Sequence, residues 1–286
     1  MSSDKIILDN IDNDYRSYNE LIKLYHTYAN DHFRTINVEI TQWFSANNCS
    51  VLGAILTELQ TNFNNINIDP GPAKEILEKN GFMAFFGHAR RNDVYDTTIS
   101  YLVLEPDDIR YFSRYISTEL FSKQSLPTMT ELIKNRFAKS IYEIFNNAAL
   151  HSKTKKIFSC GQHFPKKDII VFTITDSGIG IKNAVNNRFN SNLSSIQAIE
   201  WAVEDGNTTK EGVSGGIGFS FLREFAEANR GRIQIISNNG FWELDQGRIK
   251  TAFFDSEFPG TVVSLLINTA DEAENYVINE TFEDIF

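Results

Sequence analysis

The chain has 286 residues, of which 42% are apolar, 22% are charged and only 6 are proline. This composition excludes collagen-like, low-complexity and wholly disordered proteins, and the length fits one large domain or two ordinary ones. The formal net charge is −10, so the average surface repels phosphate backbones and disfavours a role in binding nucleic acid or an anionic membrane.

The cysteine content and the apolar stretches bear on where the protein works. Only Cys49 and Cys160 are present, so there is no disulfide framework, which favours a reducing cytoplasm. Cys160 and His163 lack the second ligand pair that zinc needs, and we interpret them as a strand-end turn. The most apolar stretches, 168–175 and 261–267, are far shorter than the roughly 18 to 20 residues of a membrane helix. We expect a cytoplasmic protein without a membrane segment.

The first third of the chain, residues 1–94, predicts a small α/β unit. Its elements alternate: a helix within 15–33, a strand over 36–40, an amphipathic helix over 50–61, a strand over 66–68 and a short helix over 73–79. Alternation of this kind is typical of an α/β fold. A polar stretch over 90–93 marks the predicted boundary with the second unit, residues 95–286.

The second unit opens with a predicted strand over 97–104 and a helix over 107–120. The segment 128–131 (TMTE) is a capping-box pattern, after which apolar residues recur with a helical period as far as Ala148. We therefore expect a long helix here.

That long helix carries the first candidate for chemistry. Glu143, Asn147 and His151 recur every four residues and so line one edge of the helix beside its apolar stripe. Mg²⁺ prefers hard oxygen ligands and keeps most of its waters, so the Asn147 oxygen and nucleotide phosphates can hold it. Glu143 can then act as a base toward the group that attacks the γ-phosphate. The alternative is a solvated polar edge.

A second candidate follows the predicted strand 169–175. Asp176 stands at the strand end, where a carboxylate can accept a hydrogen bond from an exocyclic amine such as adenine N6. Gly178 and Gly180 remove side chains where a flat base must approach the backbone. The alternative is an ordinary turn after a strand.

A third candidate is the glycine-rich segment that includes Gly216 and Gly218 and opens a predicted helix ending near Gly231. Free N–H groups and the positive dipole end of a helix suit phosphates. The segment is neither a P-loop nor a dinucleotide fingerprint, because no Lys-Ser/Thr follows the glycines and Phe221 stands where a small residue is needed. The alternative is a flexible hinge.

The order and spacing of these elements resemble the ATP-binding boxes of the GHKL superfamily, which includes gyrase, chaperone, histidine kinase and mismatch-repair ATPases. The segment 258–261 (FPGT) resembles the Gly-Thr turn of that family, in which the threonine, here Thr261, supports the adenine. The resemblance covers roughly residues 95–270 and implies an α/β sandwich of the Bergerat type.

The resemblance also implies roles for individual residues. Glu143 would be the general base, Asn147 the Mg²⁺ ligand and Asp176 the adenine contact of an ATP site. The glycines that would shape the pocket are Gly178, Gly180, Gly216 and Gly218. A mobile lid would span about 182–214, and within it Lys210 is a candidate phosphate contact, with a solvated lysine as the alternative.

The branch of the superfamily is indicated by the segment 143–152 (EIFNNAALHS), which is most similar to the anti-sigma-factor serine kinases. The N-terminal unit is similar to a STAS domain, the fold of the antagonists that those kinases phosphorylate. In that comparison Ser50 corresponds to the phosphorylated serine, although Asn48 and Val51 depart from the usual residues. An N-cap role for Ser50 is the competing interpretation.

Three functions follow from these patterns. The first is a regulatory ATPase or serine/threonine kinase that acts on a protein partner, STAS-like or other. The second is an ATP-gated conformational switch that changes dimerisation or partner choice, and the third is a nucleotide-binding module without catalysis. Glu143 favours active chemistry in the first two. The acidic segment 271–284 is predicted to be a helix or a peripheral segment.

Overall fold

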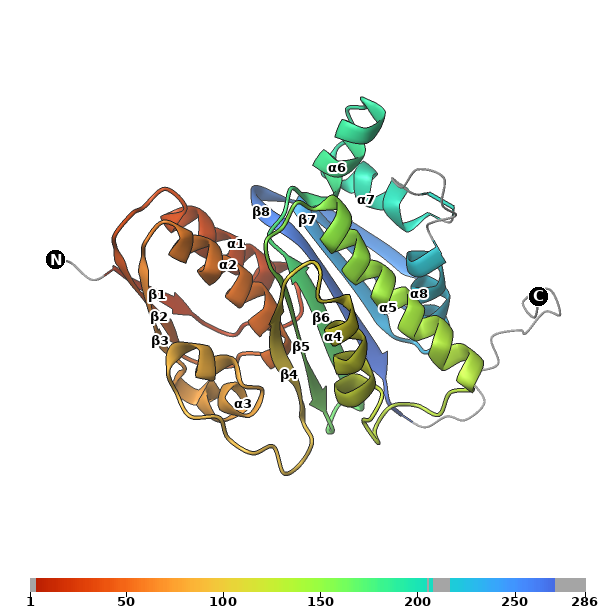
Figure 1. The fold of residues 1–286 in the computed structure, drawn as a ribbon, viewed down its shortest axis with the longest axis horizontal. Helices are drawn as coiled ribbons and strands as arrows, with labels where there is room; N and C mark the ends of the chain where they lie inside the picture. The colour runs from red at the N-terminus through yellow and green to blue at the C-terminus, as the bar shows by residue number, and fades with distance from the viewer. Residues whose placement is uncertain (1–3, 205, 208–216, 271–286) are drawn as a thin grey trace.

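The structure is a computed structural model that describes residues 4–204, 206–207 and 217–270, apart from the side chains of His151 and Ile217. The chain forms four layers: a three-stranded parallel sheet, a helix layer, a five-stranded antiparallel sheet and a second helix layer (Figure 1). The elements are β1 (Asp4–Leu8), α1 (Tyr15–Tyr28), β2 (Thr35–Ile40), α2 (Cys49–Thr61), β3 (Asn65–Asp69), α3 (Lys74–Lys79), β4 (Thr98–Leu104), α4 (Ile109–Tyr115), α5 (Glu131–His151), β5 (Ile157–Phe164), β6 (Ile169–Asp176), α6 (Gly180–Phe189), α7 (Ser195–Val203), α8 (Ile217–Ala228), β7 (Arg232–Asp245) and β8 (Arg248–Asn268).

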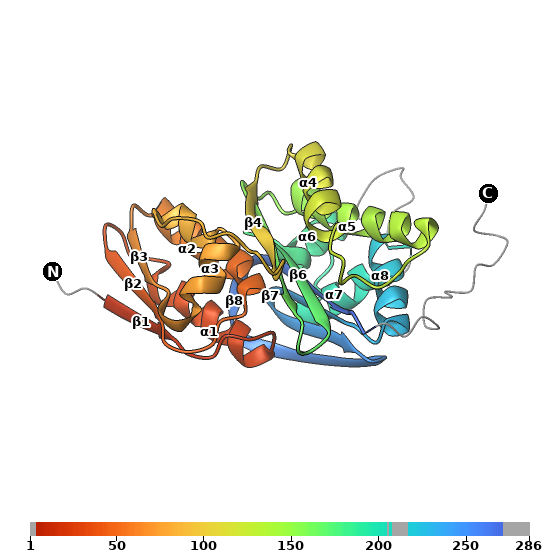
Figure 2. The ribbon, with the colours of Figure 1, turned by 90° about the horizontal axis from the view of Figure 1, so that it is seen from below.

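The N-terminal sheet has the strand order β1-β2-β3, with parallel neighbours throughout. The helices α1 and α2 lie between this sheet and the larger one, as both ribbon views show (Figures 1 and 2). This position explains why every residue of α2 from Cys49 to Leu56 is buried. The sequence predicted an amphipathic helix with one apolar face, but a helix between two sheets is covered on both sides.

The larger sheet has the order β4-β5-β6-β8-β7, and all its neighbouring strands are antiparallel. Alternate side chains of a strand point to opposite faces. On β6, Phe172 and Ile174 therefore pack with the outer helices, while Thr173 and Thr175 face the N-terminal unit. Asp176, the last residue of β6, follows Ile174 on the helix-covered face.

The two units share a hydrophobic core, although the sequence placed a boundary near residue 94. One apolar cluster joins residues of α1 and α2 to the face of the large sheet that points away from the outer helices, where Phe158, Phe258 and Val262 contribute. Polar contacts cross the same interface: Asn47 donates to Thr173 over 3.1 Å, and Ala46 N–H donates to the Gln162 side chain over 2.6 Å. The N-terminal unit is therefore a layer of the fold built against the sheet.

Several sequence-based predictions differ from the structure. The helix predicted over 107–120 is α4 followed by a π-helical turn over 116–120. Cys160 lies in the middle of β5 and is fully buried, so the strand-end turn predicted there is wrong. Strands β1 and β5 were not predicted, because β1 is short and acidic at its start and β5 contains Gly161 and polar residues.

Ser50 is not the N-cap of its helix, and its hydroxyl is buried. The helix α2 begins at Cys49, so Ser50 lies inside the first turn instead of at the N-cap. Its side chain is 0% exposed; it donates to Asn47 O over 3.0 Å and accepts from Thr175 Oγ1 over 3.1 Å. A kinase cannot reach this hydroxyl unless the interface opens.

Across the part of the chain that the structure describes, no helix is long and apolar enough to cross a membrane. The acidic segment 271–284 lies outside the described residues.

Candidate functional site

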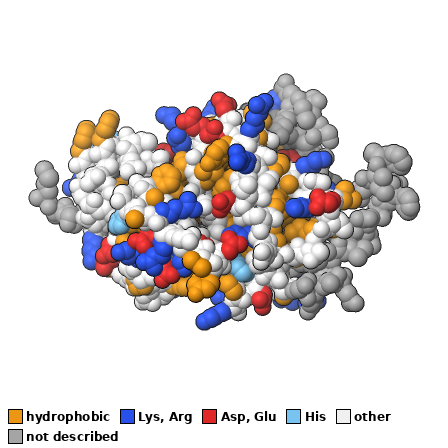
Figure 3. Space-filling model, turned by 60° about the horizontal axis from the view of Figure 1, so that its bottom comes forward, with side chains coloured by type: hydrophobic (Ala, Val, Ile, Leu, Met, Phe, Trp, Pro, Cys, Tyr) orange, Lys and Arg blue, Asp and Glu red, His pale blue; other side chains and the backbone are white. Residues whose placement is uncertain are grey.

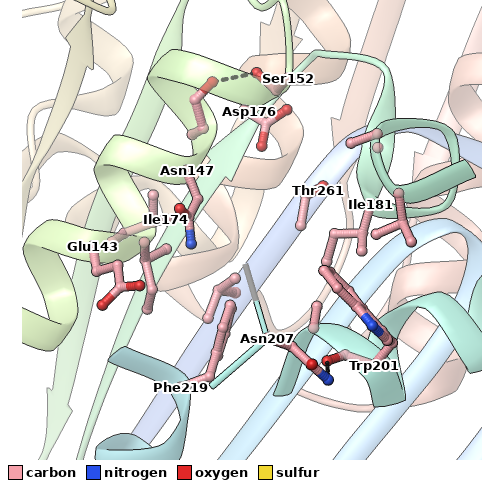
Figure 4. Close-up of a pocket in the computed structure, with 17 residues that line it drawn as sticks. Glu143, Asn147, Ser152, Ile174, Asp176, Ile181, Trp201, Asn207, Phe219 and Thr261 are labelled. Carbon is pink, nitrogen blue, oxygen red and sulfur yellow. Dashed lines mark hydrogen bonds between the residues drawn. The ribbon is translucent and has the colours of Figure 1, made fainter. Parts of the chain in front are cut away.

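A pocket lies where the end of β6 meets the helices α5, α6, α7 and α8 (Figure 4). Most of its wall is apolar, and six polar side chains, together with the indole of Trp201, interrupt that wall. Its lining residues are Glu143, Ile144, Asn147, Ala148, Ser152, Ile174, Asp176, Gly180, Ile181, Ala184, Val185, Trp201, Ala202, Asn207, Phe219, Thr261 and Val263. An apolar cleft with a few convergent polar groups is the usual form of a small-molecule site.

Helix α5 supplies one wall. Thr130 caps the helix by accepting from Ile133 N–H over 3.3 Å, and the helix runs unbroken to the pocket. Glu143 and Asn147, one turn apart, both line the pocket and are half-buried, and their side chains project toward it in the close-up (Figure 4). The helical spacing read from the sequence is therefore the spacing that brings these two groups to one place.

Gly218, at the start of α8, contacts Glu143 directly. A Cβ at position 218 would lie 2.7 Å from Glu143 Oε2 and 2.9 Å from its Cβ. Any side chain there would push the carboxylate aside, so glycine is needed for the observed position of Glu143.

Asp176 is the most perturbed acid of the pocket. It is 4% exposed, and one carboxylate oxygen accepts from Gly178 N–H over 2.9 Å. Burial raises the pKa of this carboxyl from 3.8 to about 7, and the hydrogen bonds from Gly178, Ser152 and Thr261 offset the rise only in part. A buried acid whose pKa is raised toward neutral, in a cleft, is the kind of group that indicates a candidate functional site.

The glycines around Asp176 allow close backbone approach. A Cβ at Gly178 would lie 2.1 Å from Ser152 O, at the C-terminal end of α5. Gly180 has φ +77° and Gly260 has φ +137°, and a Cβ at Gly260 would lie 1.9 Å from Asp176 O. These positions require glycine because the loop after β6 is pressed between α5 and β8, in which residues 258–261 form an irregular part of the strand and not the expected turn before it.

Thr261 stands opposite Asp176 in the β6–β8 register and lines the same pocket. Its Oγ1 lies 3.0 Å from Oγ of Ser237, a fully buried residue of β7. Ser237 in turn accepts from Ile181 N–H, in the first turn of α6, over 2.7 Å. Sequence reasoning found Thr261 but missed Ser237, since nothing local to β7 marks that serine.

The wall facing α5 is made by α6 and α7. Helix α7 and most of α6 fall within the segment 182–214 that was predicted as a polar lid, and neither helix was predicted. A capping box at Ser194 starts α7, and Trp201 of that helix lines the pocket. The lid itself stays a prediction, because Lys210 and Gly216 lie outside the described residues.

Within the described residues, no group of three or more His, Cys, Asp or Glu side chains could hold a metal ion. A Mg²⁺ ion at this pocket would therefore take most of its ligands from bound phosphates and water. Asn147 offers an amide oxygen for this purpose, which is a hard ligand of the kind Mg²⁺ prefers.

Comparison with models of known protein families finds no match, and comparison with curated proteins finds none either. The case for a function therefore rests on the residues of the pocket.

Proposed function

We propose that the protein binds ATP with Mg²⁺ in this pocket and transfers the γ-phosphate to water or to a protein partner. In this proposal the segment 95–286 is a nucleotide-binding unit of the GHKL type and the segment 1–94 a STAS-like regulatory unit. The observation that carries the proposal is the combination of a buried carboxylate at one end of an apolar cleft with a carboxylate and an amide side by side on α5.

The chemistry of the pocket fits an adenine nucleotide. Asp176 offers a buried acceptor for an exocyclic amine, and Thr261 offers a hydroxyl next to it. The apolar wall, with Ile174, Ile181 and Trp201, suits the faces of a purine ring. The glycines at 178, 180 and 260 let the loop after β6 pack closely against its neighbours and so hold Asp176 in place.

The phosphate end of the proposed ligand would lie toward α8. There Glu143 and Asn147 face the same space as Phe219, close to the N-terminus of that helix (Figure 4). Asn147 would hold the Mg²⁺ ion, which supplies charge neutralisation at the phosphates. Glu143, held in place by contact with Gly218, would accept a proton from the attacking hydroxyl.

The position of Ser50 supports transfer to water or to a separate partner in preference to the chain's own N-terminal unit. Ser50 contacts Thr175, whose side chain leaves β6 on the face opposite Asp176. The sheet therefore separates Ser50 from Glu143, and the hydroxyl is 0% exposed.

A second candidate is an ATP-gated switch, and a specific observation favours it. Strand β6 ends in the pocket at Asp176, while its Thr173 and Thr175 bond to Asn47 and Ser50 of the N-terminal unit. A shift of β6 on nucleotide binding would therefore reach the N-terminal unit without an intervening loop. In this version hydrolysis resets the switch, and a protein partner or a second copy of the chain reads it.

The test uses the full chain with Mg²⁺ and γ-labelled ATP, and follows the label into free phosphate and into protein. Glu143→Gln keeps the size of the side chain but removes the base, and should lower phosphate transfer about 100-fold or more while ATP still binds. Glu131→Gln, on the exposed first turn of the same helix, is the matched control and should keep full activity. Absence of ATP binding to the unmodified chain would refute the proposal.

A further inference from the structure

Ser237 occupies an unusual place behind the pocket. It is fully buried on β7 and pairs with Thr261 across the β7–β8 ladder, just before both strands become irregular. The irregularity includes Asn238, a non-glycine residue with φ +51°, whose side-chain amide donates to Ile179 O over 3.2 Å. Strained backbone of this kind often marks functional sites.

The hydrogen bonds of Ser237 form a short directed chain. Ile181 N–H can only donate, and it donates to Ser237 Oγ over 2.7 Å. The single proton of Ser237 can then go to Thr261 Oγ1 at 3.0 Å or to Gly260 O at 3.3 Å. The shorter distance favours Thr261.

The atom that accepts the proton of Ser237 determines whether Thr261 is a hydrogen-bond donor or an acceptor toward the pocket. If Thr261 receives the proton of Ser237, its own proton is free to point into the pocket and the hydroxyl is a donor there. If Ser237 donates to Gly260 instead, Thr261 gives its proton to Ser237 and shows the pocket only lone pairs.

We propose that Ser237 is a positioning residue for base recognition, which donates to Thr261 and so makes Thr261 a hydrogen-bond donor beside the acceptor Asp176. An acceptor next to a donor matches a base edge that carries an exocyclic amine next to an unprotonated ring nitrogen. Adenine has this edge at N6 and N1, whereas the corresponding edge of hypoxanthine or guanine has the opposite pattern. The inference rests on the proposed ATP site and names the residue that sets its preference for the base.

The test compares the affinities of ATP and of 1-deaza-ATP, in which a carbon replaces N1, by calorimetry on the full chain. The unmodified protein should bind ATP about tenfold more tightly than the analogue, as expected for one hydrogen bond. In Ser237→Ala the hydroxyl of Thr261 is no longer held, and the ratio should fall to about one to two. A purely structural role would weaken both ligands equally and leave the ratio unchanged.

Ser264→Ala is the matched control. Ser264 is a buried serine on the same strand as Thr261; it accepts from Thr173 over 3.1 Å on the opposite face of the sheet. This variant should keep the tenfold ratio. If Ser237→Ala does not fold, Ser237→Cys decides, because the thiol fills the same space as a weaker donor and should lower the ratio at least threefold.

The outcomes separate the two proposals. Failure of the unmodified chain to bind ATP would refute the proposed function itself. Binding of ATP with no preference for N1, or a tenfold ratio that survives in Ser237→Ala, would overturn the role of Ser237 while leaving the ATP site intact.

Discussion

The ionisation of Asp176 can be tested through the stability of the fold. Asp176→Asn replaces the carboxyl by a neutral group of the same shape, whose oxygen can still accept from Gly178 N–H. In the native protein burial keeps the pKa of Asp176 at about 7, whereas in the unfolded chain it returns to 3.8. Between these values the native state holds a proton that the unfolded state has lost.

The direction of the effect follows from proton linkage. Because the native state binds more protons over this range, the free energy of unfolding falls as the pH rises from about 4 to about 7. One pKa unit corresponds to about 1.4 kcal/mol, so the full loss is about 4 kcal/mol. Between pH 5 and pH 8 the expected loss in the free energy of unfolding is about 2.5 kcal/mol.

The assay is urea unfolding of both proteins at several pH values in this range. Other titrating groups cancel in the difference between the variant and the unmodified protein. That difference should grow by about 2.5 kcal/mol in favour of Asp176→Asn from pH 5 to pH 8 and level off above pH 7. Asp255→Asn, at an exposed position of β8, is the matched control and should give a flat difference.

A constant difference across the range for Asp176→Asn would refute the reasoning, since it would mean that the carboxylate is already ionised in the native protein at pH 5. If the stability difference grows with pH as expected, the burial of Asp176 lowers the stability of the fold near neutral pH. Residues at binding sites commonly lower stability in this way.

Three further predictions follow from the same contacts. Gly218→Ala should displace Glu143, because the new Cβ would lie 2.7 Å from its Oε2; turnover of ATP should fall about tenfold or more while affinity changes little, as steady-state kinetics and calorimetry would show. Adenosine, which lacks titrating phosphates, should bind more tightly as the pH rises from 6 to 8, because ionisation makes Asp176 a stronger acceptor; an affinity independent of pH in equilibrium titrations would contradict this. Thr175→Val should lower the free energy of unfolding by about 1 kcal/mol in urea, and a double-mutant cycle with Ser50→Ala should show that the two losses are not additive.

Local patterns in the sequence were enough to predict part of the site. The four-residue spacing of Glu143 and Asn147 fixes their common helix edge, and Asp176 directly follows a strongly apolar strand. These features depend only on residues close together in the chain, so the helix and strand periods determine them. The structure places all three in one pocket.

The residues that sequence reasoning missed depend on strand register. Ser237 meets Thr261 only because β7 and β8 pair with a particular offset, and nothing near residue 237 indicates its partner. Trp201 lies on a helix within a stretch that is polar on average, so its segment suggests a loop until the helix is seen to pack on β7.

The sequence also did not predict that the N-terminal unit covers one face of the large sheet. Thr173 and Thr175 alternate with apolar residues along β6, a pattern that normally predicts a face in contact with water. In the structure this face is buried by α2, and the threonines are satisfied by Asn47 and Ser50. A polar strand face and a buried polar interface have the same sequence pattern, so only the tertiary structure distinguishes them.

The burial of this face of the large sheet affects the stability of the strand that positions Asp176. Ionising Asp176 in the pocket costs stability, and the sheet that carries it gains stability from the apolar cluster shared with α1 and α2. Both contributions act on β6, one through each face of the strand. Any event that loosens the N-terminal unit therefore weakens the element that positions Asp176, and a ligand that holds Asp176 in its ionised form strengthens the same element from the other side. The fold thus gives the proposed nucleotide site and the N-terminal unit a direct mechanical connection, with the hydroxyl pair of Thr175 and Ser50 at its centre.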